Sequence, residues 1–191
     1  MFITIEGIDG VGKSTAANLL RWRLLNAFRD LEIIETCEPT EWIRDRIWDK
    51  SVDERTRMLL LCADRANHIQ QLIKPAIERG ATVICDRFGD STIAYQGCGH
   101  ELGYRDAVWA DNVARDELRP DLTFWLDCPV DVALGRMDAE DRVRGSRFYE
   151  LARAGYAQLF KTRSNVIRID ATQAIGVCVD QMFDAIAGCL I

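Results

Sequence analysis

The stretch Gly7-Ile8-Asp9-Gly10-Val11-Gly12-Lys13-Ser14, followed by Thr15, decides the fold of this chain. It matches the pattern GxxxxGK[ST], a loop that binds nucleotide phosphates between a strand and a helix. Residues 1–5 are mostly apolar and predict a buried strand, and residues 16–28 predict a helix. The glycines therefore fall at the strand-to-helix turn that the pattern requires, which predicts a nucleotide-binding α/β fold.

This loop predicts a site for the phosphates of a nucleoside triphosphate and for Mg²⁺. Its glycines allow backbone N–H groups to face phosphate oxygens, and the N-terminus of the following helix adds partial positive charge. We expect Lys13 to bind the β and γ phosphates and Ser14 to bind the metal. The predicted nucleotide contacts are Gly7, Ile8, Asp9, Gly10, Val11, Gly12, Lys13, Ser14 and Thr15.

Length, charge and cysteine content indicate one domain over residues 1–191 in a reduced, cytoplasmic setting. A chain of 191 residues with 48% hydrophobic content can bury one core of good size but hardly two. A net charge of −6 disfavours nucleic-acid or membrane partners, because both favour basic surfaces. The 7 cysteines form no CxxC pair, and the chain opens on a strand without signal-peptide features. No apolar run approaches the length that spans a membrane.

Hydrophobic patterns predict four more strands, at 31–36, 81–85, 122–126 and 166–169. Helical patterns fall between or after them, at 53–79, 104–118, 130–137 and 174–190. We expect the first of these helices to kink near Pro75. Five strands that alternate with helices predict a parallel sheet.

The predicted helix at 104–118 has the pattern of a scaffold element. Ala107, Ala110 and Val113 supply an apolar face, and Asp111 is expected to stay in solvent. We assign no chemistry to this helix.

Asp86-Arg87 follows the predicted strand 81–85, at the edge where open α/β sheets bind ligands. An aspartate in this place is the expected outer ligand of the magnesium bound by Ser14. Arg87 suits a second substrate that carries a phosphate and faces the first. Residues 86–89 also fit the DxxG pattern of GTP switches, but no lysine in the chain begins a KxD guanine box.

Two further segments could contact a ligand. Pro39 ends strand pairing after residues 31–36, and Glu38 and Thr40 are interpreted first as a turn and a helix cap. Arg65 shares an apolar helix stripe with Leu61 and therefore needs either an internal carboxylate or a ligand anion. We favour the ligand for Arg65.

Residues 136–147 contain four arginines among interleaved carboxylates. Such a run is either a solvated surface or a mobile lid over about 138–147 that closes arginines over the transferred phosphate, with Gly145 as a hinge. Both interpretations stay open on the residues alone.

Taken together, these motifs resemble the thymidylate kinase family, whose members phosphorylate dTMP with ATP. The resemblance covers nearly the whole chain and is carried by residues 2–15, Glu38-Pro39, Ala63-Asp64-Arg65, Asp86-Arg87, Asp90-Ser91-Thr92, Ala94-Tyr95-Gln96-Gly97 and Pro120-Asp121-Leu122-Thr123. It implies a P-loop kinase fold with a five-stranded parallel sheet in the order 2-3-1-4-5, a short lid, and a homodimer. It also implies ATP and Mg²⁺ as cofactors, with Ser14 and Asp86 at the metal, and a role in nucleotide biosynthesis.

The resemblance implies a role for each matching residue. Arg87 would bind the dTMP phosphate, Asp9 the sugar hydroxyl side, and Tyr95 would disfavour a ribose 2′-OH. Arg65 and Thr92 would contact the base edge. The implied substrate contacts are Glu38, Pro39, Leu61, Arg65, Arg87, Ser91, Thr92, Tyr95 and Gln96. The implied catalytic residues are Lys13, Arg87, Asp9 and the lid arginines Arg142, Arg144 and Arg147, because the phosphate loop itself carries no arginine.

Three positions depart from the family pattern, and all lie around the acceptor nucleotide. Cys37 stands where an arginine is frequent, Phe88 where a tyrosine is frequent, and Leu61 where a phenylalanine stacks on thymine. An aliphatic platform loses part of a stacking interaction worth on the order of 1 kcal/mol. A related kinase for another nucleotide or nucleoside therefore remains an alternative, and a non-catalytic nucleotide-binding regulator is a second.

Overall fold

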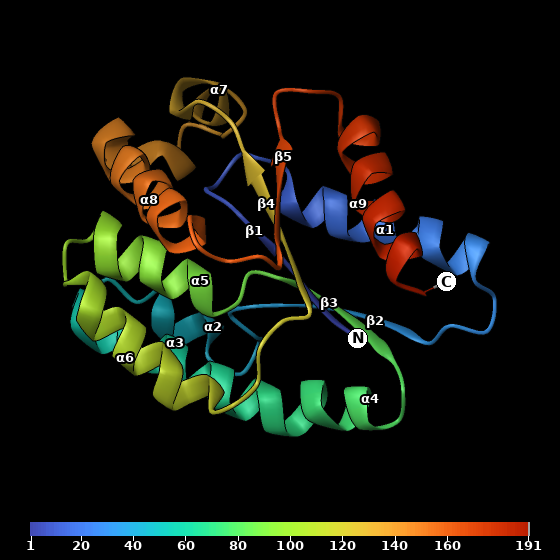
Figure 1. The fold of residues 1–191 in the computed structure, drawn as a ribbon. Coiled ribbons are helices and arrows are strands. Elements are labelled where there is room, and N and C mark those ends of the chain that lie inside the picture. The colour runs from blue at the N-terminus through green and yellow to red at the C-terminus, as the bar shows by residue number, and fades with distance from the viewer. Residues whose placement is uncertain (191) are drawn as a thin grey trace.

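A computed structural model describes residues 1–190 (Figure 1). Its centre is a five-stranded sheet in the order β2-β3-β1-β4-β5, with every neighbouring pair parallel. The strands are β1 (Phe2–Glu6), β2 (Ile33–Cys37), β3 (Thr82–Asp86), β4 (Leu122–Asp127) and β5 (Val166–Asp170). The predicted fold class and strand order are confirmed. All residues of β1 and β3 are buried, as expected for central strands covered on both faces.

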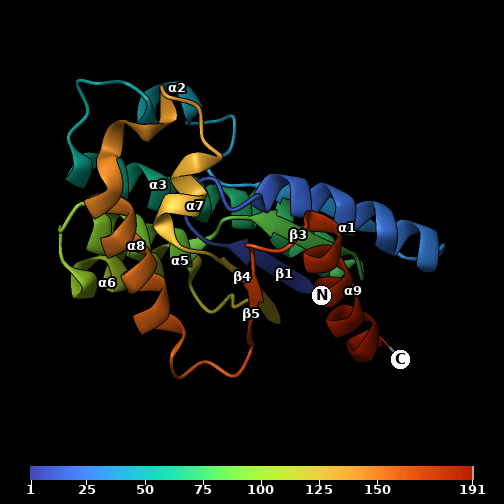
Figure 2. The same cartoon turned by 90° about the horizontal axis from the view of Figure 1, so that it is seen from above.

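Helices cover both faces of the sheet (Figures 1 and 2). On one side lie α1 (Lys13–Ala27) and α9 (Ile175–Leu190), which pack against each other. On the other lie α3 (Glu54–His68), α5 (Gly89–Thr92), α6 (Tyr104–Arg115) and α8 (Gly145–Phe160). The shorter elements are α2 (Arg44–Ile47), η1 (Ile69–Ile73), α4 (Lys74–Glu78), η2 (Ile93–Gly99), α7 (Val130–Gly135) and η3 (Asp141–Arg144).

Near Pro75, where a kink was expected, the helix contains a π-helical segment. The residues Ile69–Ile73 form η1, and Pro75 stands near the start of the α4 segment that follows. Proline cannot donate a backbone hydrogen bond, so the regular ladder must change in the turn before it.

Helix α8 corresponds to no predicted element. Its buried side chains include Phe148, Ala152, Tyr156 and Phe160, which recur every four residues along one face. This spacing is a helical signal that the arginine-rich run before it obscures. The lid segment 138–147 consequently ends inside the first turn of a 16-residue helix that packs against η2.

The expectation for Asp111 was wrong. Its side chain is 0% exposed, whereas Val113 is 63% exposed. Asp111 lies one turn after Ala107 and shares its buried face, because residues four apart stack on one side of a helix. Burial of this carboxylate is possible because Arg65 and Arg115 contact it, at 3.1 Å and 3.0 Å.

Candidate active site

The phosphate loop connects β1 to α1 in the conformation that its glycines allow. Gly7 and Gly10 have φ values of +143° and +80°. A Cβ atom would lie 2.3 Å from the Leu126 carbonyl oxygen at Gly7, and 2.2 Å from the Ala133 carbonyl oxygen at Gly10. A larger residue is excluded at both positions by conformation and by contact. Within the loop, Ile8 and Val11 point into the core and are buried, while Ser14 and the following Thr15 are exposed.

Lys13 lies within the loop, with 5% of its surface exposed. Its Nζ donates a 2.8 Å hydrogen bond to the Ile8 carbonyl oxygen. Burial and the nearby Arg87 cation lower the pKa of Lys13 to about 8. An anion beside Nζ would favour its charged form, so the loop is suited to bind phosphate.

Ser14 and Asp86 meet at the edge of the sheet, where the Ser14 hydroxyl donates to the Asp86 carboxylate. The other carboxylate oxygen, Asp86 Oδ1, is buried and has no hydrogen-bond partner. An unpaired buried oxygen beside a hydroxyl fits an oxygen-binding cation such as Mg²⁺. Within residues 1–190, no group of three or more His, Cys, Asp or Glu side chains could hold a metal.

Arg87 turns away from the strand that carries Asp86. Its φ of +70° is in the left-handed region, and its N–H donates to the Ile5 carbonyl oxygen at 3.0 Å. The guanidinium Nη2 donates to the Asp9 carboxylate and lies 3.5 Å from the Tyr95 hydroxyl. The guanidinium also lies 5.0 Å from the Tyr95 ring centre. Arg87 therefore lines the cleft from the strand end that also carries Asp86.

Asp9 stands between two arginines. Besides its contact with Arg87, it lies 3.4 Å from Arg144 Nη1 and 3.3 Å from the Tyr149 hydroxyl. Burial acts to raise the pKa of Asp9, but Arg87, Lys13 and Arg144 together lower it to about 2. The carboxylate is therefore ionised at neutral pH and offsets the positive charge of this end of the cleft.

Glu6 holds the segment after Arg87 from behind, although no sequence motif pointed to this role. Its carboxylate accepts from Phe88 N–H at 2.8 Å, from the Ser91 hydroxyl at 2.6 Å and from the Tyr156 hydroxyl at 3.0 Å. Burial and the Asp90 carboxylate raise the pKa of Glu6 to about 8. The available signal was a glutamate at the end of a strand that is mostly apolar and buried.

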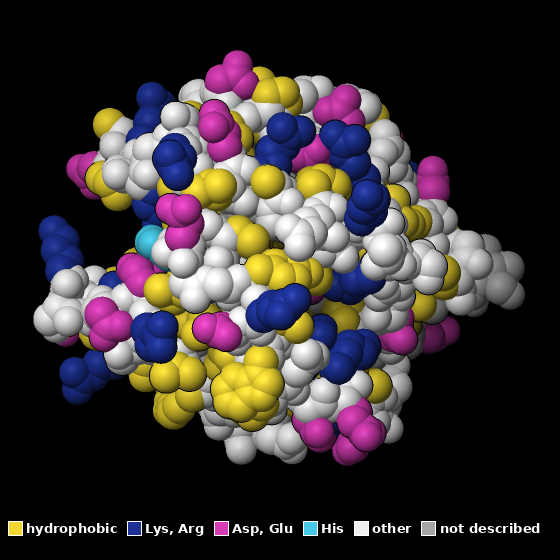
Figure 3. All heavy atoms as spheres, turned by 60° about the vertical axis from the view of Figure 1, so that its left-hand side comes forward, with side chains coloured by type: hydrophobic (Ala, Val, Ile, Leu, Met, Phe, Trp, Pro, Cys, Tyr) yellow, Lys and Arg dark blue, Asp and Glu magenta, His cyan; other side chains and the backbone are white. Residues whose placement is uncertain are grey.

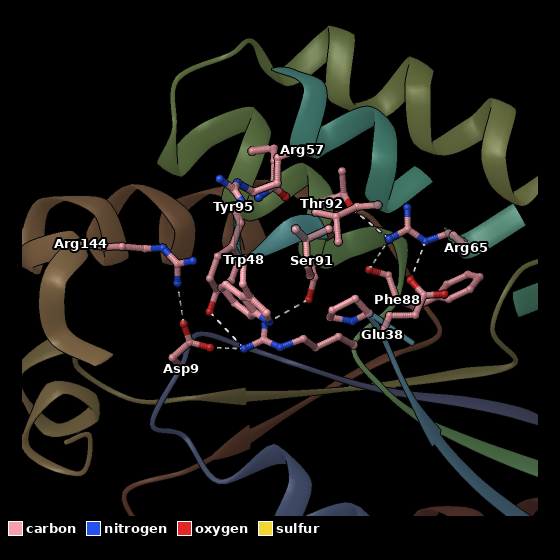
Figure 4. A pocket seen from close by; sticks show the side chains of 15 residues that line it. Asp9, Glu38, Trp48, Arg57, Arg65, Phe88, Ser91, Thr92, Tyr95 and Arg144 are labelled. Atoms are coloured by element: carbon pink, nitrogen blue, oxygen red, sulfur yellow. Dashed lines mark hydrogen bonds and ion pairs between the residues drawn. The ribbon is translucent and has the colours of Figure 1, made fainter. Parts of the chain in front are cut away.

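A cavity of about 250 Å³ extends from Arg87 toward α3 (Figure 4). All nine predicted substrate contacts line it: Glu38, Pro39, Leu61, Arg65, Arg87, Ser91, Thr92, Tyr95 and Gln96. Asp9 and Arg144 line its outer end. Ile47, Trp48 and Arg57 also line it, and no motif pointed to these three. Ile47 and Trp48 reach the cavity through the fold of α2 and the residue after it, and Arg57 reaches it from the first turn of α3; local patterns do not encode this arrangement.

Arg65 is bound by internal carboxylates and not by a ligand anion, which we had favoured for it. It is 1% exposed. Its Nε donates to Glu38 at 2.9 Å, its Nη1 to Asp111 at 3.1 Å and its Nη2 to the Thr92 hydroxyl at 2.9 Å. Glu38 is accordingly a buried ion-pair partner, beyond the turn role first assigned to it. Thr40 also bonds to α3, because its hydroxyl donates to the Asp64 carboxylate at 2.5 Å.

The three lid arginines point in different directions. Arg144 faces the cleft through its contact with Asp9. Arg142 donates instead to the Met137 carbonyl oxygen, at 2.8 Å and 2.5 Å. Arg147 has 81% of its side chain exposed and lies 3.8 Å from Glu101. Of the three, the structure brings only Arg144 to the predicted site.

A phosphate-binding loop, an aspartate beside its serine hydroxyl and a separate cavity that opens beside an arginine are the features of a P-loop nucleoside-monophosphate kinase. A family model described as "Thymidylate kinase" matches residues 5–182. A thymidylate kinase of Fervidobacterium nodosum is 39% identical over 184 residues, covering 92% of each chain. One of Pseudomonas fluorescens Pf-5 is 38% identical, covering 97% of this chain and 94% of its own. The crystal structure of a thymidylate kinase from Ehrlichia chaffeensis superposes with a TM-score of 0.82 at 28% identity, covering 97% and 98% of the two chains. This chain belongs to the thymidylate kinase family.

Proposed function

We propose that this protein transfers the γ-phosphoryl group of ATP to dTMP, giving dTDP and ADP, with Mg²⁺ at Ser14 and Asp86. The observation that carries the proposal is the adjacency of Asp86 and Arg87. One strand end points a metal ligand toward the phosphate loop and a guanidinium toward the acceptor cavity. Two phosphate-bearing substrates bound to these groups would face each other across a single peptide unit.

In this reaction a phosphate oxygen of dTMP attacks the γ-phosphorus of ATP, and the bond to the β,γ-bridging oxygen breaks. Lys13 and the loop N–H groups bind the donor phosphates, and Mg²⁺ would neutralise charge on their oxygens. Arg87 binds the acceptor phosphate, and Asp9 keeps its guanidinium in place. Arg144 is the lid arginine that reaches this end of the cavity. Positioning and charge neutralisation are sufficient for such a transfer, so no covalent nucleophile is needed.

The far end of the cavity is proposed to hold the base. Arg65 and Thr92 form a fixed polar edge there, and Leu61 supplies an apolar surface. Tyr95 is 7% exposed and braced against Phe148 and Tyr156, with ring centres 5.6 Å and 6.5 Å away. A ring fixed in this way cannot move aside for an additional hydroxyl, which supports a deoxyribose acceptor.

ADP release with ATP, Mg²⁺ and each of dTMP, dUMP, UMP, dCMP and thymidine tests the proposal. We expect dTMP to give the highest kcat/KM and thymidine to give no turnover. Lys13→Ala should lower turnover about a hundredfold or more. Lys161→Ala, at an exposed position directly after α8, is the matched control and should retain wild-type turnover. A higher kcat/KM for another monophosphate would show that dTMP is not the preferred acceptor. ADP release that no acceptor stimulates would support a non-catalytic nucleotide-binding regulator.

We also propose a homodimer that pairs through α3 and α6. Leu59, Trp109 and Val113 on these adjacent helices are 52%, 67% and 63% exposed. Figure 3 brings forward the side on which α6 lies and shows hydrophobic side chains gathered among charged ones. Light scattering should give twice the chain mass, and Trp109→Glu should halve it. Trp22→Glu on α1, where the tryptophan is 56% exposed, is the control. A wild-type monomer at micromolar concentration would contradict this proposal.

A cytoplasmic location is proposed on the chemistry of the cysteines. All seven are free thiols, and four of them are buried in the core. Mild oxidant should therefore leave the protein without internal disulfides, which mass spectrometry can check. Among residues 1–190, no helix is long and apolar enough to cross a membrane.

A further inference from the structure

Trp48 is a large aromatic residue at the mouth of the acceptor cavity (Figure 4). It follows α2 and is 59% exposed, so burial in the core does not account for its position. It lines the acceptor cavity and also a neighbouring cleft of about 740 Å³, which lies between this segment and the lid. Trp48 thus stands at the junction between the acceptor site and the lid.

Arg144 is the one predicted lid arginine that lines both spaces. Its guanidinium carbon lies 6.0 Å from the Trp48 ring centre and 5.3 Å from the Phe148 ring centre. Its contact with Asp9, at 3.4 Å, joins side chains that are 28% and 26% exposed. An ion pair that is this exposed to water holds its geometry weakly, so the other groups that contact Arg144 matter for its position. Besides the two rings, the Tyr149 side chain of α8 forms a hydrogen bond with Arg144.

The two rings differ in what they attach Arg144 to. Phe148 is 7% exposed, belongs to α8 and lies only four residues from Arg144 along the chain. Trp48 belongs to a segment almost a hundred residues away, on the opposite side of the cleft. Contact with Trp48 therefore fixes the lid arginine relative to the acceptor cavity, which contact within α8 alone cannot do.

We infer that Trp48 is a positioning residue, whose indole ring holds the Arg144 guanidinium over the acceptor cavity. The inference rests on the proposed transfer to a nucleoside monophosphate. A cation over an exposed indole is favoured by a factor of about two to five, which sets the size of the expected effect. Because the ring acts on the cation that reaches the transferred group, the loss should fall on kcat more than on KM for ATP.

Steady-state kinetics of Trp48→Ala, with Trp42→Ala as control, test this role. Trp42 is 64% exposed, precedes the same short helix and lines neither space. We expect kcat with saturating dTMP to fall about two- to five-fold in Trp48→Ala, to recover in Trp48→Phe and to stay at the wild-type level in Trp42→Ala. In an Arg144→Ala background, Trp48→Ala should have no further effect on kcat. Equal kinetics for the two alanine variants, or effects that multiply in the double variant, would overturn the inference.

A fluorescence measurement judges the contact without using activity. The wild-type emission spectrum minus that of Trp48→Phe isolates the signal of Trp48. Arg144→Ala, introduced into both proteins, should change this difference spectrum. Arg147→Ala, introduced in the same way, should not, because the Arg147 side chain is 81% exposed and lies beside Glu101. A spectrum unaffected by Arg144→Ala would refute the contact. Wild-type protein without dTMP kinase activity would refute the proposed function instead, and the difference spectrum would still decide the role of Trp48.

Discussion

Arg87→Lys is the substitution that separates the acceptor site from the donor site most sharply. The Nη2 atom of Arg87 contacts Asp9 and Tyr95, whereas its Nη1 atom makes only a 3.4 Å contact with the Ser91 hydroxyl. The arginine can therefore keep its Asp9 contact and still donate to a phosphate. A lysine carries one ammonium, which must divide between Asp9 and the phosphate. The variant should lose at least one charge-assisted hydrogen bond, worth about 1.5 to 3 kcal/mol, so dTMP should bind roughly 10- to 150-fold more weakly.

Isothermal titration calorimetry with dTMP and with ATP, each in the absence of the other, measures this effect. Affinity for ATP should stay within about twofold of wild type, because Arg87 faces the acceptor cavity. Arg55→Lys, at an exposed position of α3, is the matched control for handling and folding. Weakened ATP binding with unchanged dTMP binding would refute the assignment of Arg87 to the acceptor.

Three further predictions concern the cavity and its supports. Leu61→Phe should tighten dTMP binding several-fold if thymine is the base, since stacking on an aromatic ring is worth about 1 to 3 kcal/mol and leucine already supplies part of it; unchanged affinity in titrations would count against thymine. Glu6 has its pKa raised from 4.5 to about 8, so its contribution to stability is complete below pH 4.5 and is lost as pH rises to about 8. The free energy of unfolding of Glu6→Gln, measured in urea, should lack this decline with pH. Identical slopes of this free energy against pH for wild type and variant would disprove the prediction. Asp111→Ala should lower the free energy of unfolding by about 1.5 to 3 kcal/mol, because the buried Nη1 of Arg65 loses its acceptor while Glu38 still pairs with Nε. Asp106→Ala on the exposed face of the same helix should cost less than about 1 kcal/mol, and similar losses for the two variants would contradict this.

The sheet and the phosphate end of the site could be predicted because their signals are local. The loop of residues 7–14 has a fixed pattern, and Asp86-Arg87 follows an apolar run that ends at the ligand-binding edge. Five such runs separated by helices determine a parallel sheet. The order of the strands came from the family resemblance, since local patterns do not state which strands are neighbours.

The residues that were missed or misjudged depend on contacts between distant segments. Asp111 is buried because Arg65, 46 residues away, neutralises it, and an isolated helix pattern gives a carboxylate no reason to be buried. Trp48 lines the cavity because its segment folds over α3, and Glu6 acts on Phe88, 82 residues later. In each case the partner determines the role, and sequence periodicity reports only which face of an element is apolar.

The adjacency of Asp86 and Arg87 has a geometric consequence for the proposed reaction. Consecutive Cα atoms are about 3.8 Å apart, so the anchor of the metal and the anchor of the acceptor are spaced by covalent bonds. Loop movements elsewhere cannot lengthen that interval, and the left-handed turn at Arg87, with φ of +70°, fixes the angle between the two side chains. The end of strand β3 therefore sets the spacing between the donor and acceptor phosphates. Motion of the lid would determine when the substrates are enclosed, while their alignment would already exist in the open enzyme.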